Sequence, residues 1–350
     1  FQSTSPVHSR VGSNGDFVIP LAQPAGAFAK ALLELQHYPD LRNDKGQPVP
    51  PYDVTAHSLA VLMGIRAMPI TKLPATGRKL NENQIPPIVD TVPHSLSWSA
   101  PLLPRVAVYK SYVPAIDAGW TRYLLEHNGL PYHVSIVDKD VMEGNLRSKF
   151  QVIIIPDQPR AAILNGHRKG TMPDEYAGGL GEQGVKALRE FVEAGGTLVC
   201  LNRASDFAIE QFKLPVKDIV DGLPRTDFYV PGSILRIELD TNDPIAKGMP
   251  KESIAWVENS PVFEVSGTGV PPVNGDTSKM LVPRVIAWYP KDKDPLLSGW
   301  LLGGDRIKGK AALVEVGMGK GRIILFGFRP QYRGQSLATY PLFFNAIRQP

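Results

Sequence analysis

The sequence of 350 residues lacks most of the motifs that mark catalytic, redox and cofactor sites. Cysteine occurs once, at Cys200, so a single chain can build neither a disulfide nor a cysteine zinc site. None of the seven histidines begins H-x-x-E or H-E-x-x-H, so no zinc-hydrolase motif is present. Neither G-x-G-x-x-G after a strand nor G-x-x-x-x-G-K-[ST] occurs, so both nucleotide-binding fingerprints are missing. We therefore expect no metal and no cofactor.

The distribution of charged and apolar residues argues against a nucleic-acid partner and against a membrane span. Lys and Arg number 38 against 34 Asp and Glu, for a net charge of +4, and they form no basic run, so no nucleic-acid partner is expected. No apolar run approaches the ~20 residues that a membrane span needs.

The first residues, Phe1 to Ser5, include no initiator Met, basic region or apolar region, so we interpret the chain as a mature or truncated product.

Proline divides the sequence into two parts. It recurs from Gln47 to Pro104, where it disfavours long helices and central strands. We expect residues 1–104 to form an extended connecting region that packs on the main domain. Within it we predict a strand at 17–20, a helix at about 25–35 and a short apolar element at 59–65. The apolar side of that helix is expected to carry Phe28, Leu32, Leu33 and Leu35.

From Arg105 onward, strands and helices alternate. Strands are predicted at 105–109, 132–137, 151–155 and 197–201, and helices at 117–128, 182–194 and from 206. This rhythm indicates a doubly wound α/β domain over 105–350, with a mainly parallel, flavodoxin-like sheet. Residues 214–309 are expected to add a β-rich insertion or sheet extension, with strands at 233–239, 262–265 and 285–289. A glycine-rich hairpin at 311–328 and a helix at 337–347 complete the prediction.

Ligands of such sheets bind beyond the carboxyl ends of the strands, near the point where the strand order reverses. The long segment from Pro156 to Gly181 is interpreted as an ordered surface loop, with a functional loop as the alternative. Arg329 and Arg333 suit bidentate carboxylate binding, although pairing with acidic residues of the same domain is the simpler interpretation. Our candidate ligand-binding residues are Lys110, Ser111, Asp117, Trp120, Gln158, Arg160, Asn202, Arg203, Arg329 and Arg333.

The strand-to-helix turn after residue 201 is where a nucleophile elbow would lie. Cys200 precedes that turn, inside the apolar strand, and is interpreted as a buried core residue. Ser205 lies nearer the tip and is interpreted as the N-cap of the next helix. The alternative is a displaced catalytic site that combines Ser205, His167 and Asp157.

Taken together, these stretches resemble two known families. The order of elements from Arg105 is similar to that of the class I glutamine-amidotransferase-like (PfpI-type) superfamily. More narrowly, six motifs resemble the region that follows the catalytic domain in large bacterial zinc carboxypeptidases of the carboxypeptidase A type. The motifs are FVIPLAQP (17–24), AKALLE with HYPDL (29–41), PYDVTAH (51–57), ILNGH (163–167), ASDFAI (204–209) and FGFRPQYR (326–333).

The resemblance implies a module without chemistry of its own. The carboxypeptidase's zinc ligands belong to the preceding domain and have no match here, and no cysteine lies at 203–205, where the amidotransferase nucleophile would fall. We therefore expect a non-catalytic accessory region of a secreted or periplasmic bacterial zinc carboxypeptidase-like protein. Its partner would be the upstream catalytic domain of the same polypeptide, and its role substrate-peptide binding or homo-oligomerisation.

Two alternatives stay open. One is a hydrolase of the amidotransferase-like superfamily with the displaced Ser/His site. The other is a small-molecule or sugar-binding module in which Trp120, Arg160 and Arg329 line a cleft.

Overall fold

The computed structural model describes residues 2–4, 17–51, 58–71, 104–128, 133–266 and 282–348. Most of the proline-rich stretch, together with the PYDVTAH motif after its first residue, lies outside these ranges. Among the described residues, no helix combines the length and apolarity that crossing a bilayer requires.

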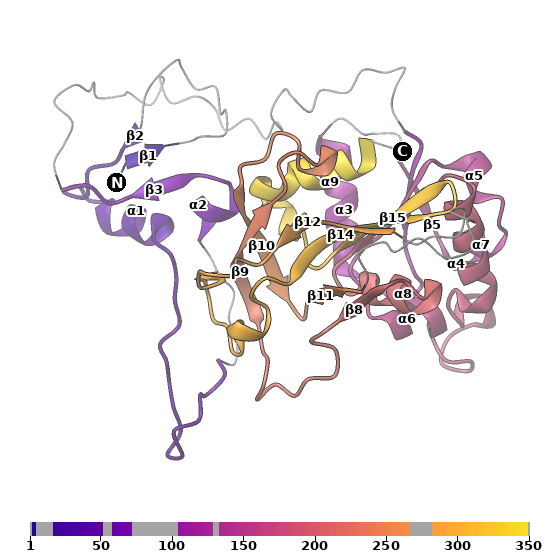
Figure 1. The fold of residues 1–350 in the computed structure, drawn as a ribbon, viewed down its shortest axis with the longest axis horizontal. Helices are drawn as coiled ribbons and strands as arrows, with labels where there is room; N and C mark the ends of the chain where they lie inside the picture. Colours follow the sequence, from indigo (N-terminus) through magenta and orange to yellow (C-terminus); the bar gives the residue numbers. More distant parts are fainter. Residues whose placement is uncertain are drawn as a thin grey trace.

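Five parallel strands form one half of the large sheet, on the right in Figure 1. They are β4 (Val106–Tyr109), β5 (His133–Ile136), β6 (Val152–Ile155), β7 (Thr197–Leu201) and β15 (Gly321–Phe326), of which β15 and β5 are labelled there. They lie side by side in the order β15-β7-β6-β4-β5, and each neighbouring pair is parallel. Counted along the chain, this is the 2-1-3-4-5 order of flavodoxin-like sheets, whose direction of winding reverses between β4 and β6. The predicted doubly wound fold is confirmed.

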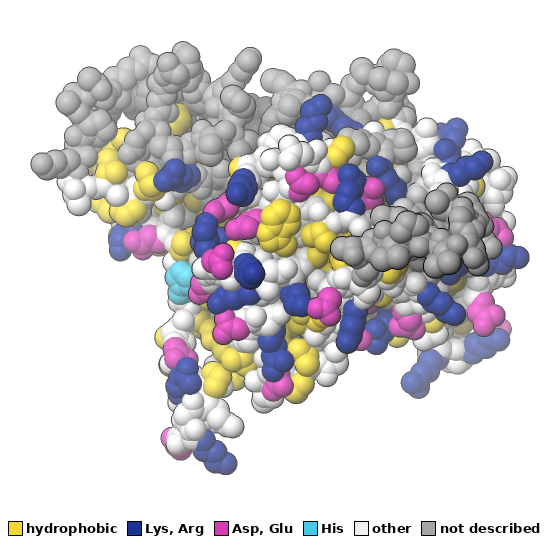
Figure 2. Space-filling view, in the orientation of Figure 1, with side chains coloured by type: hydrophobic (Ala, Val, Ile, Leu, Met, Phe, Trp, Pro, Cys, Tyr) yellow, Lys and Arg dark blue, Asp and Glu magenta, His cyan; other side chains and the backbone are white. Residues whose placement is uncertain are grey.

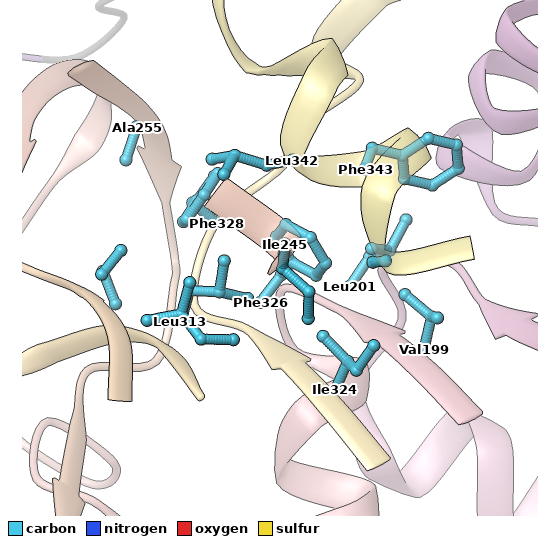
Figure 3. Packing of buried hydrophobic residues seen from close by; sticks show 14 of the residues in the cluster. Val199, Leu201, Ile245, Ala255, Leu313, Ile324, Phe326, Phe328, Leu342 and Phe343 are labelled. Carbon is cyan, nitrogen blue, oxygen red and sulfur yellow. The ribbon is translucent and has the colours of Figure 1, made fainter. Parts of the chain in front are cut away.

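Helices cover both faces of these strands, which explains why β4, β6 and β7 are buried at every position and are apolar apart from Thr197. One core contains Val106, Val108 and side chains of two helices, α3 (Ile116–His127) and α9 (Tyr340–Arg348). Figure 3 shows part of it, including Leu342 and Phe343 of α9. The other contains Ala107 and Tyr109 from the opposite side of β4. It is covered by α4 (Asp138–Met142), α5 (Leu146–Lys149), α6 (Arg160–Asn165), α7 (Gly181–Glu193) and α8 (Ala204–Phe212).

Beyond β15 the sheet continues with antiparallel strands. They are β14 (Ala311–Met318), β12 (Val282–Trp288), β9 (Pro231–Leu239) and β10 (Glu252–Glu258), with short partners β8 (Val216–Asp218), β11 (Phe263–Val265) and β13 (Leu296–Ser298). The β-rich segment is therefore an extension of the central sheet. Sequence patterns missed β8, β10 and β13.

Short helical turns complete the described elements. They are η4 (Asp174–Tyr176), η5 (Pro244–Ala246), η7 (Gly304–Arg306), η8 (Tyr332–Gly334) and η9 (Leu337–Thr339). The segment from Pro156 to Gly181 was predicted as a loop, but it contains α6 and η4. Ile163 explains the helix, because it is fully buried in the core and anchors α6 there.

The antiparallel extension curls back toward the parallel strands. The backbone N–H of Arg329, after β15, donates to the carbonyl of Trp256 in β10 at 3.2 Å. The Asn202 side chain, after β7, donates to the carbonyl of Glu258 at 3.4 Å. Apolar side chains such as Ala255, Leu313 and Phe326 fill the space inside the curl (Figure 3). The end of β10 is thereby brought to the carboxyl edge of the parallel strands.

The described N-terminal elements contact this antiparallel part. They are β1 (Gln2–Thr4), β2 (Phe17–Val18), β3 (Arg66–Met68), α1 (Gly26–Leu33) and α2 (Leu59–Leu62), of which the three strands form a separate small sheet. The hydroxyls of Ser58 and Ser298 are 2.8 Å apart, and Gly299 donates its N–H to the Gln36 carbonyl at 2.6 Å.

The side of α1 that was expected to be apolar faces water, as the space-filling view illustrates for this face of the molecule (Figure 2). Phe28 is 67% exposed and Leu32 is 38% exposed. An apolar stripe on a short helix is buried only where another element covers it, and α1 contributes no side chain to the three hydrophobic clusters of described residues.

Candidate functional site

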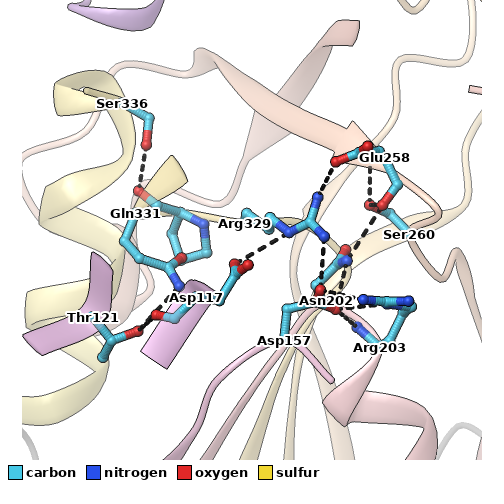
Figure 4. Close-up of polar contacts among 11 residues, drawn as sticks. Asp117, Thr121, Asp157, Asn202, Arg203, Glu258, Ser260, Arg329, Gln331 and Ser336 are labelled. Carbon is cyan, nitrogen blue, oxygen red and sulfur yellow. Dashed lines mark hydrogen bonds and ion pairs between the residues drawn. The ribbon is translucent and has the colours of Figure 1, made fainter. Parts of the chain in front are cut away.

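Charged side chains converge at the carboxyl edge of the parallel strands (Figure 4). Each follows or ends a strand, or begins the next helix, so the topology alone brings them together. We call this set the central cluster: Asp117, Asp157, Asn202, Arg203, Glu258 and Arg329. All of them except Glu258 were among the site residues named from the sequence. Glu258 was missed because β10 was not predicted, although the short apolar run at 254–257 is consistent with a buried strand.

Asp157 is the centre of the cluster and is 3% exposed. Arg203 donates to it from its backbone N–H at 3.1 Å, from Nε at 2.9 Å and from Nη2 at 2.6 Å. Asn202 Nδ2 donates at 2.9 Å, and Arg329 Nη2 donates to Oδ2 at 2.7 Å. Both carboxylate oxygens are therefore fully engaged by side chains and backbone of the same domain.

Arg329 joins three carboxylates. Besides Asp157, its Nη1 donates to Glu258 Oε2 at 2.5 Å. Its Nε lies 3.1 Å from Asp117 Oδ1, an ion pair whose angle falls outside hydrogen-bond geometry. Arg329 itself is 7% exposed. This arginine is thus bound to acidic residues of its own domain, the arrangement that the sequence favoured over ligand binding.

The cluster splits the pKa values of its two buried aspartates. Burial by itself raises the pKa of Asp157, but the hydrogen bonds and charges of Arg203 and Arg329 outweigh it and lower that pKa to about 2. Burial raises the pKa of Asp117 to about 7, because Arg329 only partly offsets the lost hydration and Asp157 adds repulsion. At neutral pH, Asp157 is therefore ionised and Asp117 is close to its midpoint.

The tip of the strand-to-helix turn is Asn202. Its backbone is left-handed, with φ of 53°, and its side chain is 0% exposed. A sharp turn with this backbone, between β7 and α8, is the geometry of a nucleophile elbow. Asparagine is among the few residues besides glycine that tolerate it. The elbow tip thus lies one residue before the stretch 203–205 at which the resemblance implied a nucleophile.

The three residues of the alternative catalytic site have other partners. Ser205 is 0% exposed, and its hydroxyl lies within hydrogen-bonding distance of the backbone carbonyls of Phe326 (3.0 Å) and Cys200 (3.2 Å). His167 Nε2 lies 3.2 Å from the carbonyl of Tyr112, and Asp157 is held by the arginines. These three side chains form no serine–histidine–aspartate triad.

Of the two interpretations of single residues at the turn, that of Ser205 is wrong and that of Cys200 is confirmed. Ser205 is not the N-cap of α8, because the helix starts at Ala204 and Arg203 occupies the cap position. Cys200 is fully buried, as expected, and burial raises the pKa of its thiol far above the usual range. A neutral, inaccessible thiol is no nucleophile.

A pocket of about 110 Å³ lies beside the central cluster, between the ends of β4 and β6. Its lining residues are Tyr109, Lys110, Ser111, Pro114, Ala115, Ala118, Pro156 and Gln158. Three of the residues named from the sequence, Lys110, Ser111 and Gln158, therefore meet at the predicted switch point. Neighbouring residues of the same loops, Asp117 and Asp157, belong to the central cluster instead.

A second group of acidic side chains lies around α6, α8 and β8. Asp206, Asp218 and Asp221 form its carboxylates, and we call it the second acidic group. Arg160 is exposed and pairs with Asp221 at 3.0 Å and with Glu210 at 3.3 Å. Burial, followed by the charges of Asp218 and Asp221, raises the pKa of Asp206 to about 8. Burial likewise raises the pKa of Asp218 to about 6.

The three residues proposed to line a sugar-binding cleft, Trp120, Arg160 and Arg329, do not line a common cleft. Trp120 packs edge-on against Tyr332, with ring centroids 5.3 Å apart. Arg160 lies in the second acidic group and Arg329 in the central cluster. Arg333 is exposed over the Tyr332 ring, 5.2 Å from its centroid, so it does not join Arg329 in a shared clamp. Within the described ranges, no three His, Cys, Asp or Glu side chains are placed to hold a metal ion.

No family model matches the chain, and no curated protein matches it. Solved structures that are similar include a ThuA-like protein from Bacteroides uniformis, at 13% identity and a TM-score of 0.38, covering 71% of this chain and 92% of that one. A cytoplasmic protein from Salmonella typhimurium has 13% identity and a TM-score of 0.41, covering 70% and 98%. A GMP synthase protein from Thermoplasma acidophilum has 11% identity and a TM-score of 0.37, covering 70% and 94%.

These similarities are too weak to identify a family or an activity, and they give no support to a carboxypeptidase parent. The α/β assignment rests on the strand order of the chain itself: a flavodoxin-like parallel sheet, extended by antiparallel strands and carrying an asparagine at its elbow.

Proposed function

We propose that this chain is a non-catalytic accessory module. The observation that carries the proposal is Asn202 at the tip of the elbow. A carboxamide is not a nucleophile of hydrolytic enzymes, which use a hydroxyl, thiol, amine or carboxylate at such a position. The Asn202 amide is also fully buried and bonded to Asp157.

The oxyanion site of the elbow is occupied as well. In an elbow enzyme, the backbone N–H of the residue after the nucleophile stabilises the oxyanion. Here that residue is Arg203, and its N–H donates to Asp157 Oδ1 at 3.1 Å. An internal carboxylate thus takes the position that a substrate oxyanion would need. Both the nucleophile and its electrostatic support are replaced by a stabilising network.

The resemblance of the sequence motifs supports a more specific context. In this proposal the chain is an accessory region of a secreted or periplasmic bacterial zinc carboxypeptidase-like protein, next to the catalytic domain of the same polypeptide. Its roles would be binding of substrate peptide or homo-oligomerisation.

A direct test assays the 350-residue chain for hydrolysis of peptides, with free and blocked C-termini, and of glutamine. We expect no turnover above a buffer blank. Turnover that disappears in Ser205→Ala would contradict the proposal. Ser233→Ala is the matched control, because Ser233 is equally buried and its hydroxyl also donates to a backbone carbonyl, that of Trp300 at 2.7 Å. Loss of turnover in Ser205→Ala but not in Ser233→Ala would place catalysis at the elbow.

The peptidase context is tested separately by the reading frame upstream of Phe1. A His-x-x-Glu motif followed by a later histidine supports it, because these are the ligands of a catalytic zinc. A different upstream domain would contradict the carboxypeptidase context and leave the non-catalytic proposal standing.

A further inference from the structure

We propose that the pocket between the ends of β4 and β6 binds a small organic carboxylate that also carries a hydrogen-bond donor. The pocket lies at the point where the winding of the sheet reverses, which is where open α/β sheets accept ligands. This inference concerns binding alone and is independent of the peptidase context.

Two features supply positive potential. Lys110 is exposed at the pocket, and the described contacts give its ammonium no ion pair or hydrogen bond. The N-terminus of α3 also borders the pocket through Ala115 and Ala118, and no side chain caps it. Uncapped N–H groups and the helix dipole favour an anion there. The acidic residue of this first turn, Asp117, is paired with Arg329 and does not line the pocket.

The side-chain amide of Gln158 would recognise the hydrogen-bond donor of the ligand. Gln158 is 5% exposed and lines the pocket. Its Nε2 donates to the carbonyl of Val113 at 2.7 Å, which fixes the orientation of the amide. Its Oε1 accepts no hydrogen bond from the described residues and is not among their fully buried unpartnered atoms, so this acceptor stays accessible in the pocket that Gln158 lines. A ligand with an N–H or O–H group would satisfy this acceptor.

The remaining walls limit the size of the ligand. Pro114, Ala118 and Pro156 give the pocket an apolar surface. Its volume of about 110 Å³ is smaller than the ~150 Å³ apolar cavity that accepts benzene in an engineered protein. The ligand therefore has at most about six non-hydrogen atoms. Small amino acids and small hydroxy acids share this chemistry.

Calorimetric titration of the 350-residue chain with L-alanine, L-lactate, propionate and inorganic phosphate tests the proposal. We expect L-alanine or L-lactate to bind, and propionate, which lacks the donor, to bind at least about fivefold more weakly. The relative affinities of alanine and lactate identify the source as an amino acid or a hydroxy acid. No binding by either, equal binding by propionate, or binding by phosphate alone would overturn the proposal.

Two variants locate the binding. Lys110→Gln should weaken it about tenfold, and Ala118→Leu should abolish it by filling the pocket. Lys149→Gln is the matched control, because Lys149 is also exposed and unpaired in the described contacts but precedes β6, at the opposite edge of the sheet. Equal losses in Lys110→Gln and Lys149→Gln would show a nonspecific charge effect and overturn the site. Undiminished binding in Ala118→Leu with a native circular dichroism spectrum would do the same.

Discussion

The central cluster and the second acidic group each contain a carboxyl group that is withdrawn from water, Asp157 buried and Asp206 half-buried, yet the pKa values of these two groups shift in opposite directions. Asp157 has its pKa lowered to about 2, whereas Asp206 has its pKa raised to about 8. Burial raises the pKa in both. The difference is the arginines: Arg203 and Arg329 bond directly to Asp157, whereas Arg160 pairs with exposed neighbours of Asp206.

The comparison shows that a nearby positive charge is not sufficient to stabilise a buried carboxylate. Direct donation by a guanidinium replaces the lost hydration, whereas a charge that acts at longer range does not. Four substitutions test this difference, in order of decreasing effect.

The largest effect is expected for Arg329→Met. Removing this buried guanidinium takes one hydrogen bond from Asp157 and one from Glu258. It also removes the arginine that is in direct contact with Asp117. We expect the free energy of unfolding at pH 7 to fall by about 3–5 kcal/mol. Urea denaturation measures it. Arg160→Met in the second acidic group is the control and should change stability by at most about 1 kcal/mol, because its ion pairs are exposed. Similar losses in both variants would contradict the comparison.

Asp157→Asn should change the acid side of the stability profile. The folded pKa of about 2 lies below the ordinary value of 3.8, so the ionised group stabilises the fold above pH 3.8 and this contribution is lost as the pH falls toward 2. The variant should be less stable at pH 7 by about 2 kcal/mol. Between about pH 4 and pH 2, its free energy of unfolding should also fall less steeply than that of the native chain, as measured by urea denaturation. An unchanged acid profile would show that Asp157 is not the group responsible.

Asp206→Asn should have the opposite sign. The folded pKa of about 8 lies above 3.8, so the folded state keeps a proton that the unfolded chain releases. Stability therefore falls as the pH rises from about 4 to 8. The variant removes this loss and should be more stable than the native chain at about pH 8.5, by at least about 1 kcal/mol, with little difference at about pH 4. A destabilised variant at the alkaline pH would refute the assignment.

The smallest effect is expected for Ser205→Ala. This change removes one hydroxyl that lies within hydrogen-bonding distance of the carbonyls of Phe326 and Cys200, so it should cost about 1 kcal/mol at every pH from about 5 to 8. Thermal unfolding followed by circular dichroism measures it. A pH-dependent loss would indicate that Ser205 is coupled to one of the titrating clusters.

The sequence predicted the parallel half of the fold well, because its signals are local. The apolar run at 152–155 and the periodic stripe of α7 each identify their element without any knowledge of the rest of the chain. The turn after β7 was likewise located, since Asn202 follows the last apolar residue of the strand. The sequence located its tip only within residues 202–205, and the left-handed backbone of the structure narrows the tip to Asn202.

The antiparallel half was predicted less well, because β10 and its neighbours depend on distant partners. Glu258 joins the site only after the sheet curls, and nothing within residues 252–258 indicates that curl. The exposed side of α1 shows the same limit: an apolar stripe predicts burial only if some other element covers it. Lys110 and Gln158 were named as candidates in two separate loops, and they line one pocket because both loops follow strands that flank the switch point.

The bonds of Arg329 have a consequence for the order in which the chain becomes organised. Asp157 precedes Arg329 by 172 residues, and Asp117 lies still further back. During synthesis, the N-terminal parts of a protein emerge and collapse first. The strands around Asp117 and Asp157 are therefore made long before Arg329, and until β15 joins the sheet Asp117 lacks its arginine and Asp157 has only the donors of Asn202 and Arg203. Completion of the carboxyl edge is thus a late, long-range step, and a ribosome-bound chain that stops before Arg329 should leave this edge open to water.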